Sequence, residues 1–250
     1  MKKINVKLNI NAKLFQKDPM STDLGKKLIK HSVRMIDDLG LESFSFRKLA
    51  SEISSTESSI YRYFENKHYL FTYLINWYWE WTNTRIDISL NNMTNPEDKL
   101  RIIIKLLVEA SLYNADTAFM DEEILHRIVV REGAKAYHHK LVDTENQYGF
   151  FLSYKALCKK IASIILELNP QHKYPKSLAS TLIEAANNHI YFAKHLPRLT
   201  DVEEIDGEKK GDINSQIFDI LYHLASASIG HSKTDSDEAK ALKDQKLNLS

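Results

Sequence analysis

The sequence predicts an all-α protein with a three-helix N-terminal domain, a larger C-terminal helical bundle and a short N-terminal β arm. From about residue 21 onward, apolar residues recur every three or four positions, which is the period of amphipathic helices. The 250 residues include only 7 Gly and 5 Pro, which disfavours an all-β fold with many tight turns. Helices are therefore expected through most of the chain.

The composition is that of a globular protein from a reducing compartment. Hydrophobic residues make up 43% and charged residues 27% of the chain, which is ordinary for a globular domain. Cys158 is the only cysteine, which excludes an intramolecular disulfide and a thiolate-rich metal site. No run approaches the roughly 18 apolar residues of a membrane span, and the residues after Met1 lack the apolar core of a secretory signal. We expect a cytoplasmic protein without a membrane partner.

Charge is unevenly divided along the chain. Residues 1–75 hold 13 Lys and Arg against 8 Asp and Glu, whereas the remaining residues hold 21 against 25. A basic N-terminal part attached to a mildly acidic remainder is typical of a protein that carries a nucleic-acid-binding domain. The asymmetry is modest and supports DNA binding without establishing it.

Residues 4–14 alternate strictly between apolar and polar side chains, the only clear period-2 pattern in the sequence. A lone strand needs a partner. We favour an arm that lies against the body of the protein; the alternatives are pairing with its twin in a dimer and ordering on DNA.

Start and stop signals divide the N-terminal part into four helices. Gly40 closes the first helix, Ser45 and Thr56 are N-caps of two short helices, and Asn66 opens a long fourth helix. After a break at residues 91–96, apolar stripes predict further helices. The stripes cover residues 100–108, 119–133, 147–168, 176–195 and 213–229.

Residues 45–70 have the spacing of a helix-turn-helix. Ala50 is small enough for a second helix to cross the first, and Ser54 and Ser55 suit a tight connection. Ile60 and Tyr63 lie one turn apart on the inward side of the second helix. In such a motif the second helix lies in the major groove, with its N-terminal side chains at the base edges. An ordinary helical corner is the alternative.

The same segment resembles the TetR family of bacterial regulators. The resemblance rests on Leu49-Ala50, on Ser-Ile-Tyr-Arg-Tyr-Phe at 59–64, and on Asn66-Lys67 followed by Leu70, and it covers about residues 22–75. The family usually has glycine at the position of Ser54 and an aliphatic residue at that of Ser55, so the two serines predict a less constrained turn. Beyond residue 75 the resemblance is architectural only.

The resemblance implies which residues contact DNA. Ser45, Tyr61, Tyr63 and Lys67 would hold the phosphate backbone, and Lys67 also stands at a helix N-terminus that favours phosphate. Thr56 to Ser59 and Arg62 would read or flank bases. The complete predicted set is Ser45, Arg47, Lys48, Thr56, Glu57, Ser58, Ser59, Tyr61, Arg62, Tyr63 and Lys67.

The aromatic residues of the fourth helix have two interpretations. Trp77 and Trp81 lie one turn apart and share a face. They form either the wall of an effector pocket or, as we favour, packing between the two domains. The predicted effector-binding residues are Trp77, Trp81, Phe119, His126, Phe151 and Tyr154.

No metal, cofactor or catalytic site is expected. His138 and His139 are adjacent and point to different faces of a helix, and neither they nor His126 have a Cys or carboxylate at matching spacing. Glu122 and Glu123 are interpreted as solvated charges at a helix start. The sequence contains no nucleophile elbow, phosphate loop or zinc-hydrolase motif, so we do not expect an enzyme.

The predicted organisation is an N-terminal arm (1–20), a helix-turn-helix DNA-binding domain (21–68), a helical effector-binding and dimerisation domain (69–230) and a disordered polar tail (231–250). The long stripes at 147–168 and 176–195 are expected to be buried, either in the dimer interface that the resemblance implies or around a pocket. The sequence leaves that choice open.

The predicted function is that of a sequence-specific DNA-binding transcriptional regulator. It would be a repressor that binds a palindromic double-stranded operator as a homodimer and is released by a small apolar or aromatic effector. Two alternatives remain: a DNA-binding regulator without an effector, and a helical protein-interaction module whose N-terminal corner only resembles a DNA reader.

Overall fold

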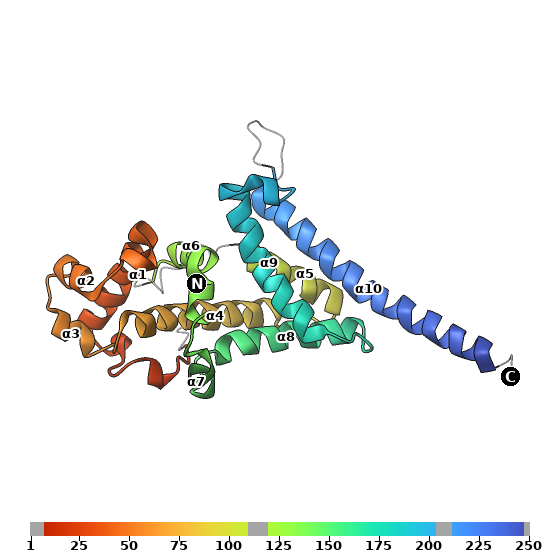
Figure 1. The fold of residues 1–250 in the computed structure, drawn as a ribbon, viewed down its shortest axis with the longest axis horizontal. Coiled ribbons are helices and arrows are strands. Elements are labelled where there is room, and N and C mark those ends of the chain that lie inside the picture. The colour runs from red at the N-terminus through yellow and green to blue at the C-terminus, as the bar shows by residue number, and fades with distance from the viewer. Residues whose placement is uncertain (1–7, 110–119, 204–211, 248–250) are drawn as a thin grey trace. The chain divides into compact units, whose positions relative to one another are not determined.

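The computed structural model describes residues 8–109, 120–203 and 212–247 (Figure 1). Every regular element in these residues is helical, which confirms the predicted fold class. None of the helices in the described ranges is both long and apolar enough to cross a membrane.

The chain divides into two compact units that interleave in the sequence. The first contains Met1–Thr84 and Ala110–Lys155, and the second contains Arg85–Glu109 and Ala156–Ser250. This division differs from the predicted boundary at residue 68. The reason is that a later helix packs against the first helix of the N-terminal domain, so that the two belong to one unit.

The first unit is built from the following elements: η1 (Ala12–Leu14), η2 (Pro19–Ser21), α1 (Asp23–Ser43), α2 (Phe46–Glu52), α3 (Glu57–Tyr61), most of α4 (Lys67–Leu90), α6 (Glu122–Glu132), η4 (Gly133–Ala136), α7 (Val142–Gln147) and the start of α8 (Leu152–Leu168). α1 packs against α2 and α6, and α2 packs against α3. Aromatic rings fill much of the interior; fully buried examples are Phe44, Phe64, Phe71, Tyr73 and Phe150.

Local side-chain caps explain where the N-terminal helices begin. The hydroxyl oxygens of Thr22, Ser45 and Thr56 each accept a hydrogen bond from the backbone N–H three residues later, at 3.1, 3.3 and 3.2 Å. The Asn66 side chain caps α4 in the same way. Ser45, Thr56 and Asn66 therefore act as predicted. Gly40 has a φ of 77°, and α1 continues after this kink to Ser43 instead of ending there.

The predicted β arm is only partly within the described residues. Residues 4–7 lie outside them, and residues 8–14 form no strand but contain the 3-10 turn η1. Asn11 accounts for this local structure: its side-chain oxygen accepts from the N–H of Lys13, and its amide nitrogen donates to the carbonyl of Tyr148 at 2.8 Å. Tyr148 belongs to the same unit, so this part of the chain lies against the body of that unit.

The second unit contains α5 (Pro96–Val108), the remainder of α8, α9 (Pro175–His195), η5 (Pro197–Leu199) and α10 (Ile213–Leu247). α9 packs against α5 and α10, and α5 also packs against α10. Its core is aliphatic; buried members are Ile103, Ile104, Ile161, Ile165, Leu182, Ile183, Ile217 and Leu221. Burial raises the pKa of the Cys158 thiol to about 11, so this cysteine is not a reactive thiolate.

The last helix is longer than expected. α10 continues to Leu247, although the sequence predicts a disordered tail from residue 231. Residues 238–243 read Glu-Ala-Lys-Ala-Leu-Lys, all strong helix formers. The polar composition of the tail therefore does not indicate a lack of helix.

Candidate nucleic-acid interface

The turn between α2 and α3 is tightly constrained. Ser54 has a φ of +53°, in the left-handed region, and its N–H donates to the carbonyl of Ser51. The N–H of Ser55 donates to the carbonyl of Ala50 at 2.9 Å. These two bonds form a Schellman motif, which satisfies the last carbonyls of α2 and fixes the direction of the following chain. The prediction of a less constrained turn was therefore wrong.

Replacing Ser54 with Gly is expected to stabilise the protein by about 0.5–1 kcal/mol, because a left-handed backbone costs any residue with a Cβ more than it costs glycine. The matched control is Ser51→Gly, which places glycine inside α2 and should lower stability by about 0.5 kcal/mol. Denaturant unfolding of the two variants measures both effects. A destabilising Ser54→Gly would contradict the assigned turn geometry.

The outer face of α2 and α3 presents polar and basic side chains. Arg47, Ser58, Tyr61 and Arg62 are exposed, and the Tyr61 ring packs edge-on against buried Phe46 with centroids 5.1 Å apart. Among the residues that the structure describes, neither guanidinium has an ion-pair partner. Two cations and the Tyr61 hydroxyl thus lie on one surface of a helix-turn-helix, beside the Ser58 hydroxyl, which contacts Thr56.

The N-terminal residues of α3 are held in place by one another. The Thr56 hydroxyl lies 2.9 Å from those of both Ser58 and Ser59. Glu57 is half-buried in the first turn, where a carboxylate favours the helix N-terminus. Ser45 caps α2, and the Lys48 ammonium donates to the carbonyl of Ser43 at 2.8 Å. These contacts orient the predicted base-reading residues before any DNA is bound.

Two of the predicted phosphate contacts point into the domain instead. The Tyr63 side chain is buried, and its hydroxyl lies 2.7 Å from the Thr22 hydroxyl at the start of α1. The Lys67 ammonium donates to the carbonyls of Leu41 and Glu42, both at 3.1 Å, and contacts that of Phe44 at 3.4 Å. Both side chains therefore fix helix ends in this structure.

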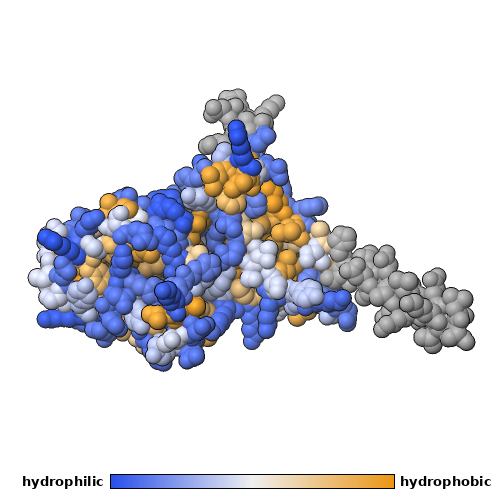
Figure 2. Space-filling view, in the orientation of Figure 1, coloured by the Kyte–Doolittle hydropathy of each residue, from blue (hydrophilic) through white to orange (hydrophobic). Residues whose placement is uncertain are grey.

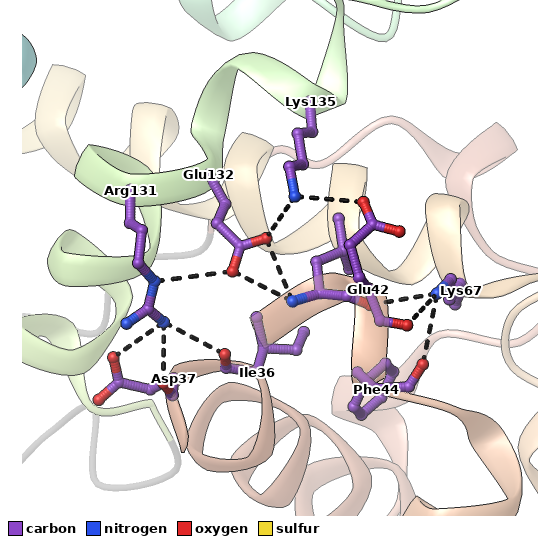
Figure 3. Close-up of polar contacts among 9 residues, drawn as sticks. Ile36, Asp37, Glu42, Phe44, Lys67, Arg131, Glu132 and Lys135 are labelled. Carbon is purple, nitrogen blue, oxygen red and sulfur yellow. Dashed lines mark hydrogen bonds and ion pairs between the residues drawn. The ribbon is translucent and has the colours of Figure 1, made fainter. Parts of the chain in front are cut away.

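The C-terminal end of α1 is also tied to α6 (Figure 3). Both carboxylate oxygens of buried Glu132 accept from the N–H of Leu41 at 3.1 Å. The Arg131 guanidinium donates to the carbonyls of Ile36 and Asp37, at 3.2 and 2.8 Å. Arg127 forms an ion pair with Asp37 at 2.6 Å. The contacts around Glu132 were not predicted, because they join residues about ninety positions apart.

The predicted effector residues fall into separate groups within the first unit. Trp77 and Trp81 stack with centroids 6.1 Å apart, and the Trp81 indole donates to Glu122 at 2.7 Å. His126 lies against the hydroxyl of Tyr78 at 2.7 Å. Phe119 lies outside the described residues. Glu122 is buried, contrary to the expectation of a solvated charge, because it faces Trp81, whereas Glu123 is exposed.

Phe151 and Tyr154 belong to a second aromatic cluster. The Tyr154 ring lies 5.1 Å from that of Trp79 and stacks on Tyr137 at 5.8 Å, and Tyr137 also contacts Phe151. The Trp79 indole N–H is buried and has no hydrogen-bond partner among the described residues. An unsatisfied buried donor is costly. Among the polar groups of this cluster, the Trp79 N–H would therefore gain most from a hydrogen bond to a ligand.

Comparison with known proteins supports the helix-turn-helix assignment. Residues 28–74 match the family model described as bacterial regulatory proteins, tetR family. No curated protein was found to match the sequence. Several solved structures share the fold at low identity. They include AibR in complex with isovaleryl coenzyme A and operator DNA (TM-score 0.53, 15% identity, covering 80% of this chain and 97% of that one). A second is the ketosteroid regulator KstR2 of Mycobacterium tuberculosis, with a TM-score of 0.50 and 11% identity, covering 91% of this chain and 98% of that one. A third is the fatty acid degradation regulator FadR of Bacillus halodurans, with a TM-score of 0.51 and 14% identity, covering 80% of this chain and 92% of that one.

Proposed function

We propose, because residues 28–74 match the family model of bacterial regulatory proteins, tetR family, that the protein represses transcription in the cytoplasm by binding a palindromic operator as a homodimer. The observation that carries this proposal is the exposed face of α2 and α3. Arg47 and Arg62 supply charge for phosphates or guanine edges, and Ser58 and Tyr61 supply hydroxyls. Tyr63 and Lys67 contribute by fixing the helices that carry this face.

Dimerisation would compensate for the shortness of the recognition helix. α3 has five residues, so one copy reaches few base pairs, whereas two copies on a two-fold axis read an inverted repeat. The second unit offers apolar surface for such an interface: Leu166, Leu196, Leu199 and Leu224 are 39–58% exposed. Figure 2 shows apolar side chains gathered over α9 and η5.

The effector proposed here binds at the aromatic cluster of Trp79, Tyr137, Phe151 and Tyr154. Its rings favour an apolar or aromatic ligand, and a ligand oxygen would accept the Trp79 N–H. AibR, which shares the fold, binds isovaleryl coenzyme A together with operator DNA. An effector releases DNA only if it binds the DNA-incompetent state more tightly, by several kcal/mol for a complete switch.

The first experiment is selection of bound sequences from random duplex DNA at near-physiological salt. An enriched inverted repeat would support the proposal. Weak, salt-sensitive binding without enrichment would contradict it and favour nonspecific binding.

On the selected operator, Arg62→Ala is expected to weaken binding by about 1–3 kcal/mol, which is about 5- to 150-fold, because it removes a cation from the groove-facing helix. Lys159→Ala is the matched control: this exposed cation on α8 lies in the second unit and should leave affinity unchanged. Fluorescence anisotropy with labelled operator measures both. If the two substitutions weakened operator binding equally, this would contradict the assignment of α3 as the DNA-reading element.

The effector proposal has a separate test. A library of small molecules is screened by thermal shift, since a ligand that binds the folded state raises the midpoint. A ligand found in this way should lose affinity in Trp79→Phe, which keeps an aromatic ring but removes the N–H donor. If no compound in the library raised the midpoint, this would favour a regulator that works without an effector.

A further inference from the structure

Three side chains from separate elements of the first unit converge outside the helix-turn-helix. They are His68 in the first turn of α4, His139 between η4 and α7, and Glu145 on α7. Nε2 of His68 lies 2.9 Å from Oε1 of Glu145, and Nε2 of His139 lies 3.1 Å from Oε2. One ligand atom from each residue lies within 4.8 Å of the other two. We propose that these residues bind a divalent transition-metal ion such as Zn²⁺.

The charge of Glu145 provides the first argument. Its side chain is 3% exposed, and its carboxylate contacts, within the described part of the chain, are the two imidazoles. No Lys or Arg of the described residues forms an ion pair with this carboxylate. A buried carboxylate is costly unless its charge is paired, and a divalent cation between the three groups would pair it.

The donor set provides the second argument. Two imidazole nitrogens and one carboxylate oxygen form a set that suits Zn²⁺ and similar transition metals, whereas Mg²⁺ and Ca²⁺ prefer oxygen ligands throughout. In a tetrahedral site with bonds of about 2.0–2.1 Å, ligand atoms lie about 3.3 Å apart. The two histidine-to-Glu145 distances are close to this value, and all three ligand atoms lie within 4.8 Å of one another, so the side chains must still close around the ion to complete the site. Water would occupy a fourth position.

Binding of the ion through Nε2 replaces the imidazole contacts with Glu145 and the 3.4 Å contact between His68 Nε2 and the Thr72 hydroxyl, and it also opens one backbone hydrogen bond. Nδ1 of His139 accepts the backbone N–H of Leu141 at 3.2 Å, which places the proton of a neutral ring on Nε2, facing Glu145. Metal binding through Nε2 moves this proton to Nδ1. Leu141 is an exposed residue, and water is the replacement partner that its N–H would need.

The adjacent histidine makes a natural control. His138 is exposed and takes no part in the cluster, so the pair separates a specific ligand from a surface imidazole. The ion would join α7 to the first turn of α4, immediately after the helix-turn-helix. The inference goes beyond the proposed function and does not depend on it, because metal binding is measured without DNA or effector.

The experiment uses the full-length protein without a histidine tag, treated with chelator and then titrated with ZnCl₂ in competition with a chromophoric chelator. We expect one tightly bound equivalent, and we expect Co²⁺ to give the visible absorption bands of a low-symmetry, four-coordinate site. His139→Ala and Glu145→Gln should each weaken binding by at least about tenfold, while His138→Ala should leave it unchanged.

Glu145→Gln is the variant that keeps the interpretation independent of folding. Its amide oxygen can still accept from both histidines, so we expect a native circular dichroism spectrum together with the loss of Zn²⁺. The proposal would be overturned if the unsubstituted protein did not bind one equivalent of Zn²⁺ saturably. Unchanged affinity in folded Glu145→Gln, or equal losses in His138→Ala and His139→Ala, would overturn it as well.

Discussion

Replacing Glu132 with Ala is expected to lower the free energy of unfolding by about 2–3 kcal/mol, because it leaves a buried backbone donor unsatisfied. The kink at Gly40 takes the N–H of Leu41 out of the regular hydrogen bonding of α1, and Glu132 accepts it with both carboxylate oxygens. The ion pair of Glu132 with Lys135, at 3.2 Å, contributes less, since Lys135 is 44% exposed. Most of the loss therefore comes from Leu41.

Two further substitutions separate the hydrogen bond from the charge. Glu132→Gln keeps an oxygen that can accept the Leu41 N–H, so it should cost only about 1 kcal/mol. Glu123→Ala removes a carboxylate that is 71% exposed on the same helix and should cost less than about 0.5 kcal/mol. The three tryptophans all belong to the first unit, so their fluorescence reports its unfolding in denaturant. Equal losses for Glu132→Ala and Glu123→Ala would contradict the assigned role of Glu132.

The features that the sequence predicted well depend on neighbours a few residues away. A Ser or Thr N-cap satisfies an N–H three positions later, so Ser45 and Thr56 could be identified without a fold. The same holds for Asn66 and for the spacing of the helix-turn-helix. The all-α fold class followed in the same way from the repeat of apolar residues.

Side-chain roles that depend on tertiary contacts were not predictable from local patterns. Lys67 stands at a helix N-terminus, where a phosphate contact is reasonable, but the folded chain places the end of α1 within reach of its ammonium. Tyr63 is similar, because its partner Thr22 lies 41 positions away. In both cases the sequence predicted a phosphate contact, and in the structure the side chain bonds to a partner within the domain.

The histidines show the same limit more sharply. His138 and His139 lie in bends between η4 and α7 and not on a helix as predicted, and His139 does meet a carboxylate, that of Glu145. What the spacing could not show is that His68, 77 positions before Glu145, reaches the same carboxylate. A ligand set assembled from three elements has no sequence motif, and only the fold brings it together.

Replacing Gly25 with Ala is expected to destabilise the first unit by about 2–3 kcal/mol, through overpacking against the backbone. An added Cβ would lie 2.2 Å from the carbonyl oxygen and 2.7 Å from the Cα of Pro19. Both are backbone atoms of the turn η2, which packs on α1, and Pro19 is itself buried. No side-chain rotation can relieve the contact, so the turn must move.

The displacement would also disturb the start of α1. Thr22 immediately follows η2, and its hydroxyl both accepts the N–H of Gly25 and bonds to the hydroxyl of Tyr63. Gly230→Ala is the matched control, since its added Cβ meets nothing within 4 Å on the exposed helix α10, and it should stabilise by about 0.5–1 kcal/mol. The unfolding of Gly25→Ala in denaturant is measured by tryptophan fluorescence. That of Gly230→Ala is measured by far-ultraviolet circular dichroism. If Gly25→Ala did not lower the free energy of unfolding, the close packing of η2 on α1 would not be needed for the stability of the first unit.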